Sequence, residues 1–363
     1  MNKAQKLPPY ILVKILDGFR ALLLTIHRKM FPPSVVLYEQ FQSFWLMQPL
    51  YIVAELDIAG LLKEKPLSAG ELAERTNTRP EALYRVMRAL ASSGIFRESD
   101  GRIFSLNALS TALLEGDGGM RNMVMQHLGH INWVTAGNLM HTVKTGENAF
   151  TGLFGSDIYP YLEKHQNEML RFEKSMSDLS SLALHPVLAR YDFRKYQTIA
   201  DIGGGEGFLL AGILGKYQGP AGILFDLPEN SAKARYFIKA SGMEGRISFK
   251  AGSFLEPFNI AADLYIMKNV LHNWDDGQFC RILANLHNTM KKGSKLLILE
   301  MVVPGPGISS YSKLVDIQML ATMPGGKERT GREFEDLLRN SGLRLNRIIP
   351  TIAPLSILET VGE

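Results

Sequence analysis

A cluster of glycines at residues 203–207 constrains the fold of this chain more than any other feature. It follows a short apolar run at 198–202, which predicts a buried strand, and it precedes an apolar helical pattern that begins near Leu209. Glycine lets the backbone turn sharply and lets a ligand approach it closely. The helix start adds free N–H groups and the positive end of a helix dipole. The segment therefore predicts a strand, a ligand-binding turn and a helix.

The spacing of the glycines excludes the dinucleotide fingerprint G-x-G-x-x-G. Counting from Gly203, the third glycine falls on Phe208, and counting from Gly205 it falls on Leu210. The chain instead has Asp201 followed by glycines at every second position. This pattern resembles the nucleoside-binding loop of class I S-adenosylmethionine (SAM) dependent methyltransferases. A glycine turn that binds no ligand is the alternative.

The composition predicts a globular protein with room for two domains. The chain has 363 residues, of which 46% are hydrophobic and 21% charged, and its net charge is +4. Such a small net charge does not by itself indicate a nucleic-acid-binding surface. The single Cys280 excludes an intrachain disulfide and indicates a reducing compartment, so we expect a cytoplasmic protein. No apolar run approaches the length of a transmembrane helix, so we expect no stable membrane insertion.

The N-terminal segment 9–31 has the apolar periodicity of a helix, which Pro32 and Pro33 end. One interpretation is a helix that packs on a partner subunit. The other is an interfacial membrane helix, because basic residues occur at 14, 20, 28 and 29. Asp17 and Gly18 weaken a membrane-binding face and favour the first.

Residues 35–105 predict apolar helices and then a winged helix. Ser68 and Glu71 form a capping box for one helix, and a second helix runs from Pro80 to Gly94. Two short strands flank the turn at 100–101. A winged helix suggests DNA binding, and a metabolite-sensing regulator is one hypothesis. The mild net charge and the enzyme-like second half favour a dimerisation module.

From residue 191 onward strands and helices alternate, which predicts an α/β, Rossmann-like doubly wound sheet. The expected strands are 198–202, 221–226, 246–250, 263–268 and 295–300, with a hairpin of 343–350 and 356–360 at the sheet edge. We therefore expect a helical, winged-helix dimerisation domain at 1–118, connecting helices at 119–190 that line a substrate pocket, and a SAM-binding methyltransferase domain at 191–363.

Residues that could bind a ligand or take part in catalysis lie at or just after the ends of five of these strands. In such a sheet ligands bind outside the carboxyl ends of the strands, so these residues should face one crevice. Asp226 can accept the hydroxyls of a ribose or cap its own turn, and Phe254 can stack on an adenine ring. His272 is the candidate general base, and Glu300 can orient its ring. Asp275 is predicted to cap the next helix through Gln278, and a metal site of residues 272, 275 and 276 is disfavoured.

Several stretches together resemble the class I SAM-dependent O-methyltransferases of the plant caffeic-acid and acetylserotonin type, which have bacterial small-molecule relatives. The matching stretches are 172–180, 201–207, 225–228, 268–274, 299–300 and 325–330. The resemblance implies an intertwined homodimer, His272 as the base, and Glu300 and Glu328 as its flanking glutamates. It also implies that SAM, with S-adenosylhomocysteine as the product and no metal, is bound by Phe172, Met176, Ser180, Asp201, Gly203, Gly205, Asp226, Leu227, Ser253, Phe254 and Lys268.

Two positions depart from the family pattern. Ser253 stands where the family often has Asp, and Asn273 follows the histidine where Asp is common. We expect methylation of a phenolic hydroxyl on an apolar small metabolite, with Met125, Trp133, Met319 and Met323 as candidate substrate-lining residues. Some family members keep SAM but catalyse hydroxylation, decarboxylation or pericyclic reactions, and that alternative stays open.

Overall fold

The computed structural model describes residues 8–116 and 118–362, which divide into two compact units. The helical unit comprises 8–134 and 165–179, and the α/β unit comprises 135–164 and 180–362. The helices between residues 119 and 190 are therefore shared between the two units. Among the described helices, none is both long enough and apolar enough to span a bilayer.

The helical unit begins with four helices. The proline pair at 32–33 ends the first helix and starts the second, because proline is tolerated at the first turn of a helix and breaks a helix interior. These helices are α1 (Tyr10–Met30), α2 (Pro33–Gln42), α3 (Phe44–Glu55) and α4 (Ile58–Leu61).

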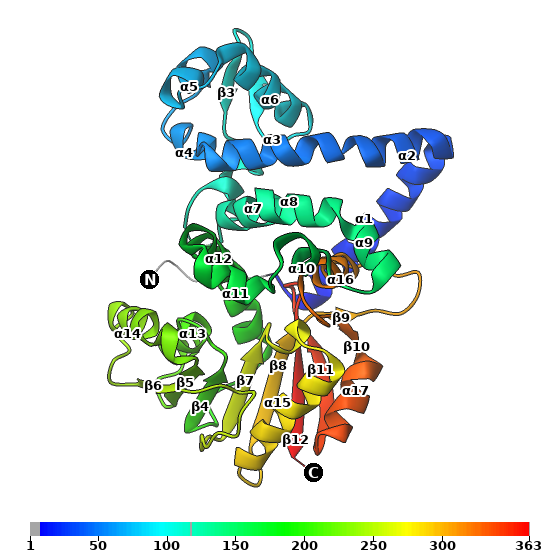
Figure 1. Cartoon of the computed structure of the whole chain (residues 1–363). Helices are drawn as coiled ribbons and strands as arrows, with labels where there is room; N and C mark the ends of the chain where they lie inside the picture. The colour runs from blue at the N-terminus through cyan, green and yellow to red at the C-terminus, as the bar shows by residue number, and fades with distance from the viewer. Residues whose placement is uncertain (1–7, 117, 363) are drawn as a thin grey trace. The chain divides into compact units, whose positions relative to one another are not determined.

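The predicted winged helix follows them (Figure 1). Ser68 Oγ accepts a hydrogen bond from the Glu71 N–H, and the Glu71 carboxylate accepts one from the Ser68 N–H, so the capping box is confirmed. A two-residue strand that the sequence did not predict completes a three-stranded sheet of order β1-β3-β2. The elements are β1 (Leu67–Ser68), α5 (Ala69–Arg75), α6 (Pro80–Ser92), β2 (Arg97–Ser99), β3 (Ile103–Ser105) and η1 (Ser110–Leu113).

The α/β unit contains the predicted doubly wound sheet, with strand order β11-β12-β8-β7-β4-β5-β6. The five strands from β4 to β8 are parallel, and β11 and β12 form the antiparallel hairpin at one edge. Ser356 of β12 pairs with Glu300 at the end of β8. The strands are β4 (Thr198–Ile202), β5 (Ala221–Asp226), β6 (Ile247–Ala251), β7 (Leu264–Lys268), β8 (Lys295–Glu300), β11 (Leu343–Pro350) and β12 (Ser356–Gly362).

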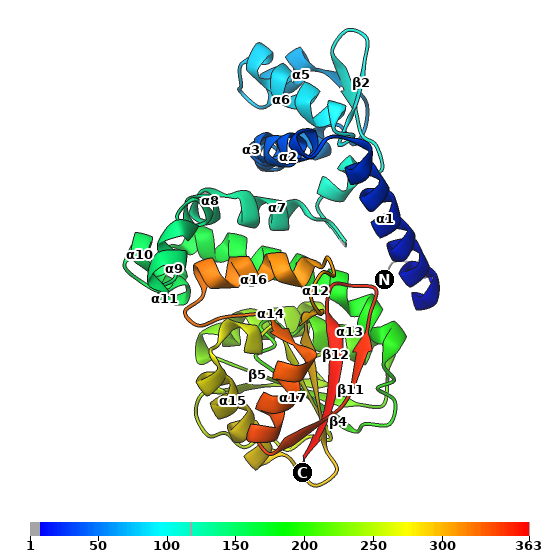
Figure 2. The same cartoon turned by 90° about the vertical axis from the view of Figure 1, so that its right-hand side faces the viewer.

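Successive side chains of a strand point to opposite faces of the sheet, and here each face has its own core. On one face Ile199 and Ile266 pack with residues of α13 (Phe208–Lys216), α14 (Ser231–Ala240) and the end of α12. On the other face Ala200 and Met267 pack with α15 (Asp276–Thr289) and α17 (Gly331–Asn340). Figure 2 shows α15 and α17 on the side of the sheet opposite α13. The short turns are η2 (Pro228–Asn230) and η3 (Leu271–Asn273).

The connecting segment is helical, as predicted. It comprises α7 (Arg121–Leu128), α8 (His130–Gly137), α9 (Leu139–Thr145), α10 (Ala149–Phe154), α11 (Ile158–Lys164) and α12 (Gln166–Arg190). The α/β unit also contains α16 (Tyr311–Thr322) and a small parallel pair, β9 (Val302–Val303) with β10 (Arg329–Thr330). This pair was not predicted, and it brings the segment that carries Glu328 beside the end of β8.

Candidate active site

The glycine bend after β4 is a tight turn with one open position. Gly203 has φ 71°, and a Cβ atom there would lie 2.9 Å from Cγ2 of Val270. Gly205 has φ 60°, but a Cβ atom there would meet no heavy atom of the described chain within 4 Å. The first glycine is thus required by packing, whereas the second leaves space where a ligand can approach the backbone. Val270, which contacts this bend, precedes His272 by two residues in the chain.

The carboxylate of Asp226, at the end of β5, hydrogen-bonds to the glycine bend. Its Oδ2 accepts a hydrogen bond of 2.7 Å from the Gly205 N–H, and its Oδ1 accepts bonds from the Leu227 N–H and the Asn230 amide. The predicted turn-capping role is therefore confirmed. The same carboxylate lies at the carboxyl end of the strand next to β4, which is the position required for a ribose contact.

Asp201, near the end of β4, is buried, and it interacts electrostatically with the half-buried Lys268 at the end of the adjacent strand β7. Burial raises the pKa of Asp201 to about 7, against the attraction of Lys268. Burial also lowers the pKa of Lys268, while Asp201 and Glu300 act in the opposite direction. Asp201 Oδ1 is buried and has no hydrogen-bond partner among the residues that the structure describes. A buried acceptor without a partner is costly and indicates a missing donor.

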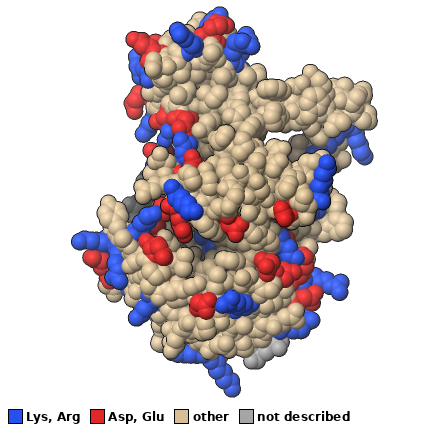
Figure 3. Space-filling model, in the orientation of Figure 1, with Lys and Arg blue, Asp and Glu red and all other residues tan. Residues whose placement is uncertain are grey.

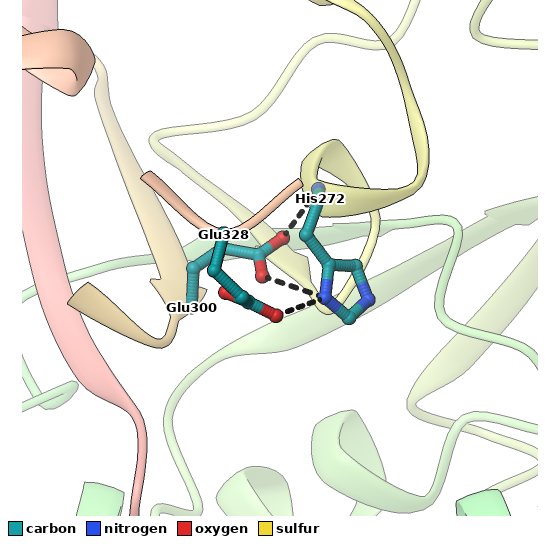
Figure 4. A group of neighbouring side chains, drawn as sticks. All are labelled: His272, Glu300 and Glu328. Carbon is teal, nitrogen blue, oxygen red and sulfur yellow. Dashed lines mark hydrogen bonds and ion pairs between the residues drawn. The ribbon is translucent and has the colours of Figure 1, made fainter. Parts of the chain in front are cut away.

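Two buried glutamates, Glu300 and Glu328, lie on the Nδ1 side of the His272 ring (Figure 4). Its Nδ1 is 2.7 Å from Oε1 of Glu328 and 3.7 Å from Oε2 of Glu300. Oε1 of Glu300 accepts the backbone N–H groups of residues 270, 271 and 272, at 3.0, 3.0 and 3.4 Å. The chain turns after β7 at Asn269, whose φ is 52°, and this turn aims those N–H groups at the carboxylate.

The two carboxylates fix the state of the imidazole ring. Burial alone would lower the pKa of His272, but the charge of Glu300 and the hydrogen bond to Glu328 outweigh it and raise that pKa above its ordinary value. Burial raises the pKa of Glu300, against the attraction of His272. With Nδ1–H donating to Glu328, the neutral ring has its lone pair on Nε2. In the described part of the chain no residue hydrogen-bonds Nε2, which points away from both carboxylates in Figure 4.

Arg329 is a residue of this site that sequence reasoning missed. It is fully buried and donates to the carbonyls of Leu271 and Trp274, on either side of His272. It also pairs with Asp276 at 2.8 Å and lies 4.7 Å above the ring of Phe279. Because Arg329 directly follows Glu328, these bonds link the segment that carries Glu328 to the turn that carries His272. A buried arginine has no sequence signature that separates it from a surface one.

The acidic residues near His272 have structural partners. Asp275 accepts the Gln278 N–H at 2.8 Å and caps α15, as predicted, and Asp276 binds Arg329. The ligand atoms of His272, Glu300 and Glu328 lie within 4.8 Å of one another, so these three are the set that a metal ion would use.

The loop after β6, which contains Ser253 and Phe254, lies against the glycine bend. A Cβ atom on Gly203 would be 3.2 Å from Cε1 of Phe254, whose ring packs edge-on against Trp274. Ser253 Oγ accepts the Leu255 N–H at 3.2 Å, which orients the hydroxyl at the start of this loop.

The remaining predicted residues are divided between the two units. Phe172, Met176 and Ser180 are spaced four residues apart on α12 and therefore share one helix face. Trp133 packs on Phe44 in the helical unit, with ring centroids 5.0 Å apart, and Met125 lies on α7. In the α/β unit, Met319 lies buried on α16. Met323 is the first residue after that helix and is buried next to Gly326.

The basic surface of the winged helix is partly neutralised. Arg102 donates to Glu81 at 2.8 Å and lies 4.1 Å above the ring of Tyr84, and Arg88 lies over the same ring at 5.3 Å. The ion pair with Glu81 offsets the charge of Arg102, whereas the ring contact of Arg88 leaves its charge in place.

Comparison with known proteins identifies both parts of the chain. Residues 137–344 match the O-methyltransferase domain, and residues 38–116 match the O-methyltransferase dimerisation domain. The chain belongs to the SAM-dependent O-methyltransferase family. The match to the dimerisation domain implies that this O-methyltransferase is a homodimer, and it supports the dimerisation interpretation of the winged helix.

Individual relatives extend over most of the O-methyltransferase. It is 35% identical to the phenazine O-methyltransferase PhzM of Lysobacter antibioticus over 90% of this chain and 96% of the relative. The crystal structure of LaPhzM superposes with a TM-score of 0.86 at 34% identity, covering 92% of this chain and 100% of that one. The SAH-bound structure of CalO1, a methyltransferase of calicheamicin biosynthesis, has a TM-score of 0.81 at 30% identity, with 91% and 98% covered.

Proposed function

We propose that this enzyme transfers the methyl group of SAM to a hydroxyl group, phenolic in character, on an apolar small metabolite, with His272 as the general base. The observation that carries the proposal is the ring of His272, whose Nδ1 is engaged by Glu328 while Nε2 remains an acceptor. When bound, SAM supplies an electrophilic methyl group on its sulfonium sulfur.

The residues at the strand ends fit such a cofactor. The open position at Gly205 admits a ligand against the backbone, and the unpartnered Oδ1 of Asp201 can accept a bond from an ammonium group. Asp226 would hold the ribose with the adjacent Leu227, and Phe254 would flank the adenine beside Ser253. Lys268, Gly203 and the α12 residues Phe172, Met176 and Ser180 complete the proposed set.

His272 would remove the proton of the acceptor hydroxyl. A phenol has a pKa near 10, so at neutral pH only about one molecule in a thousand is ionised. A base in hydrogen-bond reach contributes roughly two to four orders of magnitude in rate. Each turnover moves the hydroxyl proton to Nε2 and leaves S-adenosylhomocysteine as the second product. Glu328 and Glu300 would stabilise the imidazolium cation, since both carboxylates lie beside Nδ1.

The substrate class follows from the relatives and the apolar lining. Phenazine, an aromatic ring system, stands in the name of the PhzM relative, and CalO1 is a methyltransferase of calicheamicin biosynthesis. The first of these names supports an aromatic acceptor. The methionines at 125, 319 and 323 and the indole of Trp133 provide apolar, adaptable surface for such rings.

The test is His272→Ala, assayed with SAM and a panel of phenolic metabolites. We expect SAM binding measured by calorimetry to persist, while methyl transfer falls at least about a hundredfold. Turnover equal to that of the unmodified enzyme would remove His272 as the base. If the unmodified enzyme consumed the substrate in the presence of SAM without forming a methylated product, that result would instead support a hydroxylation, decarboxylation or pericyclic step.

A further inference from the structure

The N-terminal helix α1 presents an apolar row that nothing in the described chain covers. Nine large side chains on one side of the helix are between 46% and 73% exposed, and no residue of α1 is buried. They recur at helical spacing and are Ile11, Leu12, Ile15, Leu16, Phe19, Leu22, Leu23, Ile26 and Met30. Lys14, Arg28 and Ala21 lie on the opposite side of the helix.

The exposed area is too large for an ordinary monomer surface. At about half exposure, nine such residues present on the order of 1,000 Å², whereas the largest apolar patch of a monomer is about 300–600 Å². A stable interface uses about 800 Å² per partner. The row on α1 alone is therefore large enough to form an interface.

The helix also needs an external contact for its own stability. Among the described residues no side chain caps its N-terminus, and none places an atom within 4 Å of a Cβ built on Gly18, in the middle of the helix. In proteins most helical stability comes from packing of an apolar face rather than from intrinsic propensity, and interior glycine costs about 1 kcal/mol relative to alanine. Packing of the apolar row against another surface would supply the missing stability.

Exposed apolar side chains continue from α1 into the dimerisation domain. The residues after α1 that are also exposed are Phe31, Val35, Leu37, Tyr38, Phe41, Phe44 and Trp45, and the last four belong to the matched dimerisation domain. Residues 31–54 contain a single charged side chain, Glu39. Figure 3 shows the end of the segment formed by α2 and α3 as almost free of acidic and basic groups. In contrast, α1 itself lies outside both matched family domains, the first of which begins at residue 38.

We propose that α1 is an additional dimerisation arm, whose apolar row packs on the second copy of this chain and extends the interface of the dimerisation domain. The continuity from Phe31 to Trp45 favours a second copy over a membrane surface. An acidic residue, Asp17, and the central Gly18 also make α1 a poor interfacial membrane helix.

Photo-crosslinking of the purified full-length enzyme identifies what covers the row. We would introduce p-benzoylphenylalanine in place of Phe19 and, as the matched control, in place of Ala21 on the opposite side of the helix. We expect a covalent species of twice the chain mass at position 19 and little of it at position 21. Crosslinks that remain within one chain at position 19, or equal yields at both positions, would overturn the proposal.

A charged substitution within the apolar row tests how much the row contributes to the stability of the dimer. Leu22→Asp should raise the dissociation constant of the dimer at least about tenfold in sedimentation experiments, because burying an unpaired carboxylate is costly, whereas Ala21→Asp should leave it unchanged. SAM binding should persist in both variants, which separates this test from the proposed chemistry. A Leu22→Asp enzyme that dimerises normally but no longer binds phosphatidylcholine vesicles with about one quarter phosphatidylglycerol would show that the row binds membranes instead.

Discussion

Oε1 of Glu328 lies 2.7 Å from Nδ1 of His272, so the ring hydrogen of the proposed base points at a buried carboxylate and away from any acceptor substrate. This contact selects the tautomer in which Nε2 can take a proton. It also supplies a counter-charge at the moment the imidazolium forms. The predictions below follow from this pair and from the residues that hold it.

Glu328→Gln should move the pH dependence of methyl transfer. His272 must be neutral to act as a base, so activity rises as pH passes through its pKa, which Glu328 helps to raise. Removing the charge lowers that pKa, so the acidic limb of the kcat/KM profile should shift to lower pH. The plateau should fall by about one to two orders of magnitude, because the imidazolium loses its partner. The exposed Glu335→Gln is the control, and an unmoved limb in Glu328→Gln would contradict the assignment.

Asp201→Asn should change how stability depends on pH. Asp201 has its folded pKa raised to about 7 from 3.8, so its contribution to stability is complete below pH 3.8 and is lost as pH rises through about 7. Relative to the Asn variant, the unmodified enzyme should lose roughly 2 kcal/mol between pH 5.5 and pH 8 in urea unfolding without SAM. Asp192→Asn, at an exposed carboxylate with a pKa lowered to about 2, should show no such trend. Parallel curves for Asp201→Asn and the unmodified enzyme would refute the expectation.

Arg329→Lys should impair turnover more than cofactor binding. Lysine keeps a charge for Asp276 but cannot also reach the carbonyls of Leu271 and Trp274, so the turn that carries His272 loses its anchor. We expect kcat to fall at least about tenfold while the SAM dissociation constant changes by less than about threefold. Arg281→Lys, which alters the exposed pair with Glu256, is the matched control. Equal losses in both variants would show that Arg329 has no special role.

Chelators should leave methyl transfer unchanged. The three ligand atoms of His272, Glu300 and Glu328 are close enough to hold a cation, but in the proposed mechanism Nδ1 carries a proton that a cation would displace. Dialysis against EDTA should therefore preserve activity, and added Zn²⁺ should inhibit it. Loss of activity in EDTA that returns with a divalent ion would replace the general-base proposal by a metal-assisted one.

The strands of the α/β unit could be predicted because local signals agree there with the tertiary fold. The run at 198–202, the glycine bend and the later apolar runs each match an observed strand or turn of the α/β unit. Asp275 and Ser68 behave as the caps that their spacing predicts, since capping depends only on residues three positions apart.

What the sequence could not show depends on contacts between distant segments. The parallel pair of β9 and β10 has two residues in each strand, too few for a periodic pattern, yet it brings Glu328 beside the end of β8. The burial of Arg329 depends on Asp276 and two carbonyls that lie more than fifty positions away in the chain. Neither arrangement leaves a local signature.

Glu300 serves the backbone as well as the ring, since one of its oxygens binds three consecutive N–H groups of the turn after β7. A descendant of this enzyme that abandoned methylation would still need that carboxylate to fold the turn, whereas Glu328 has its side chain committed to His272 alone among the described residues. When such sequences are surveyed, the presence of a glutamate at position 300 therefore says little about chemistry, and its counterpart at 328 is the informative position.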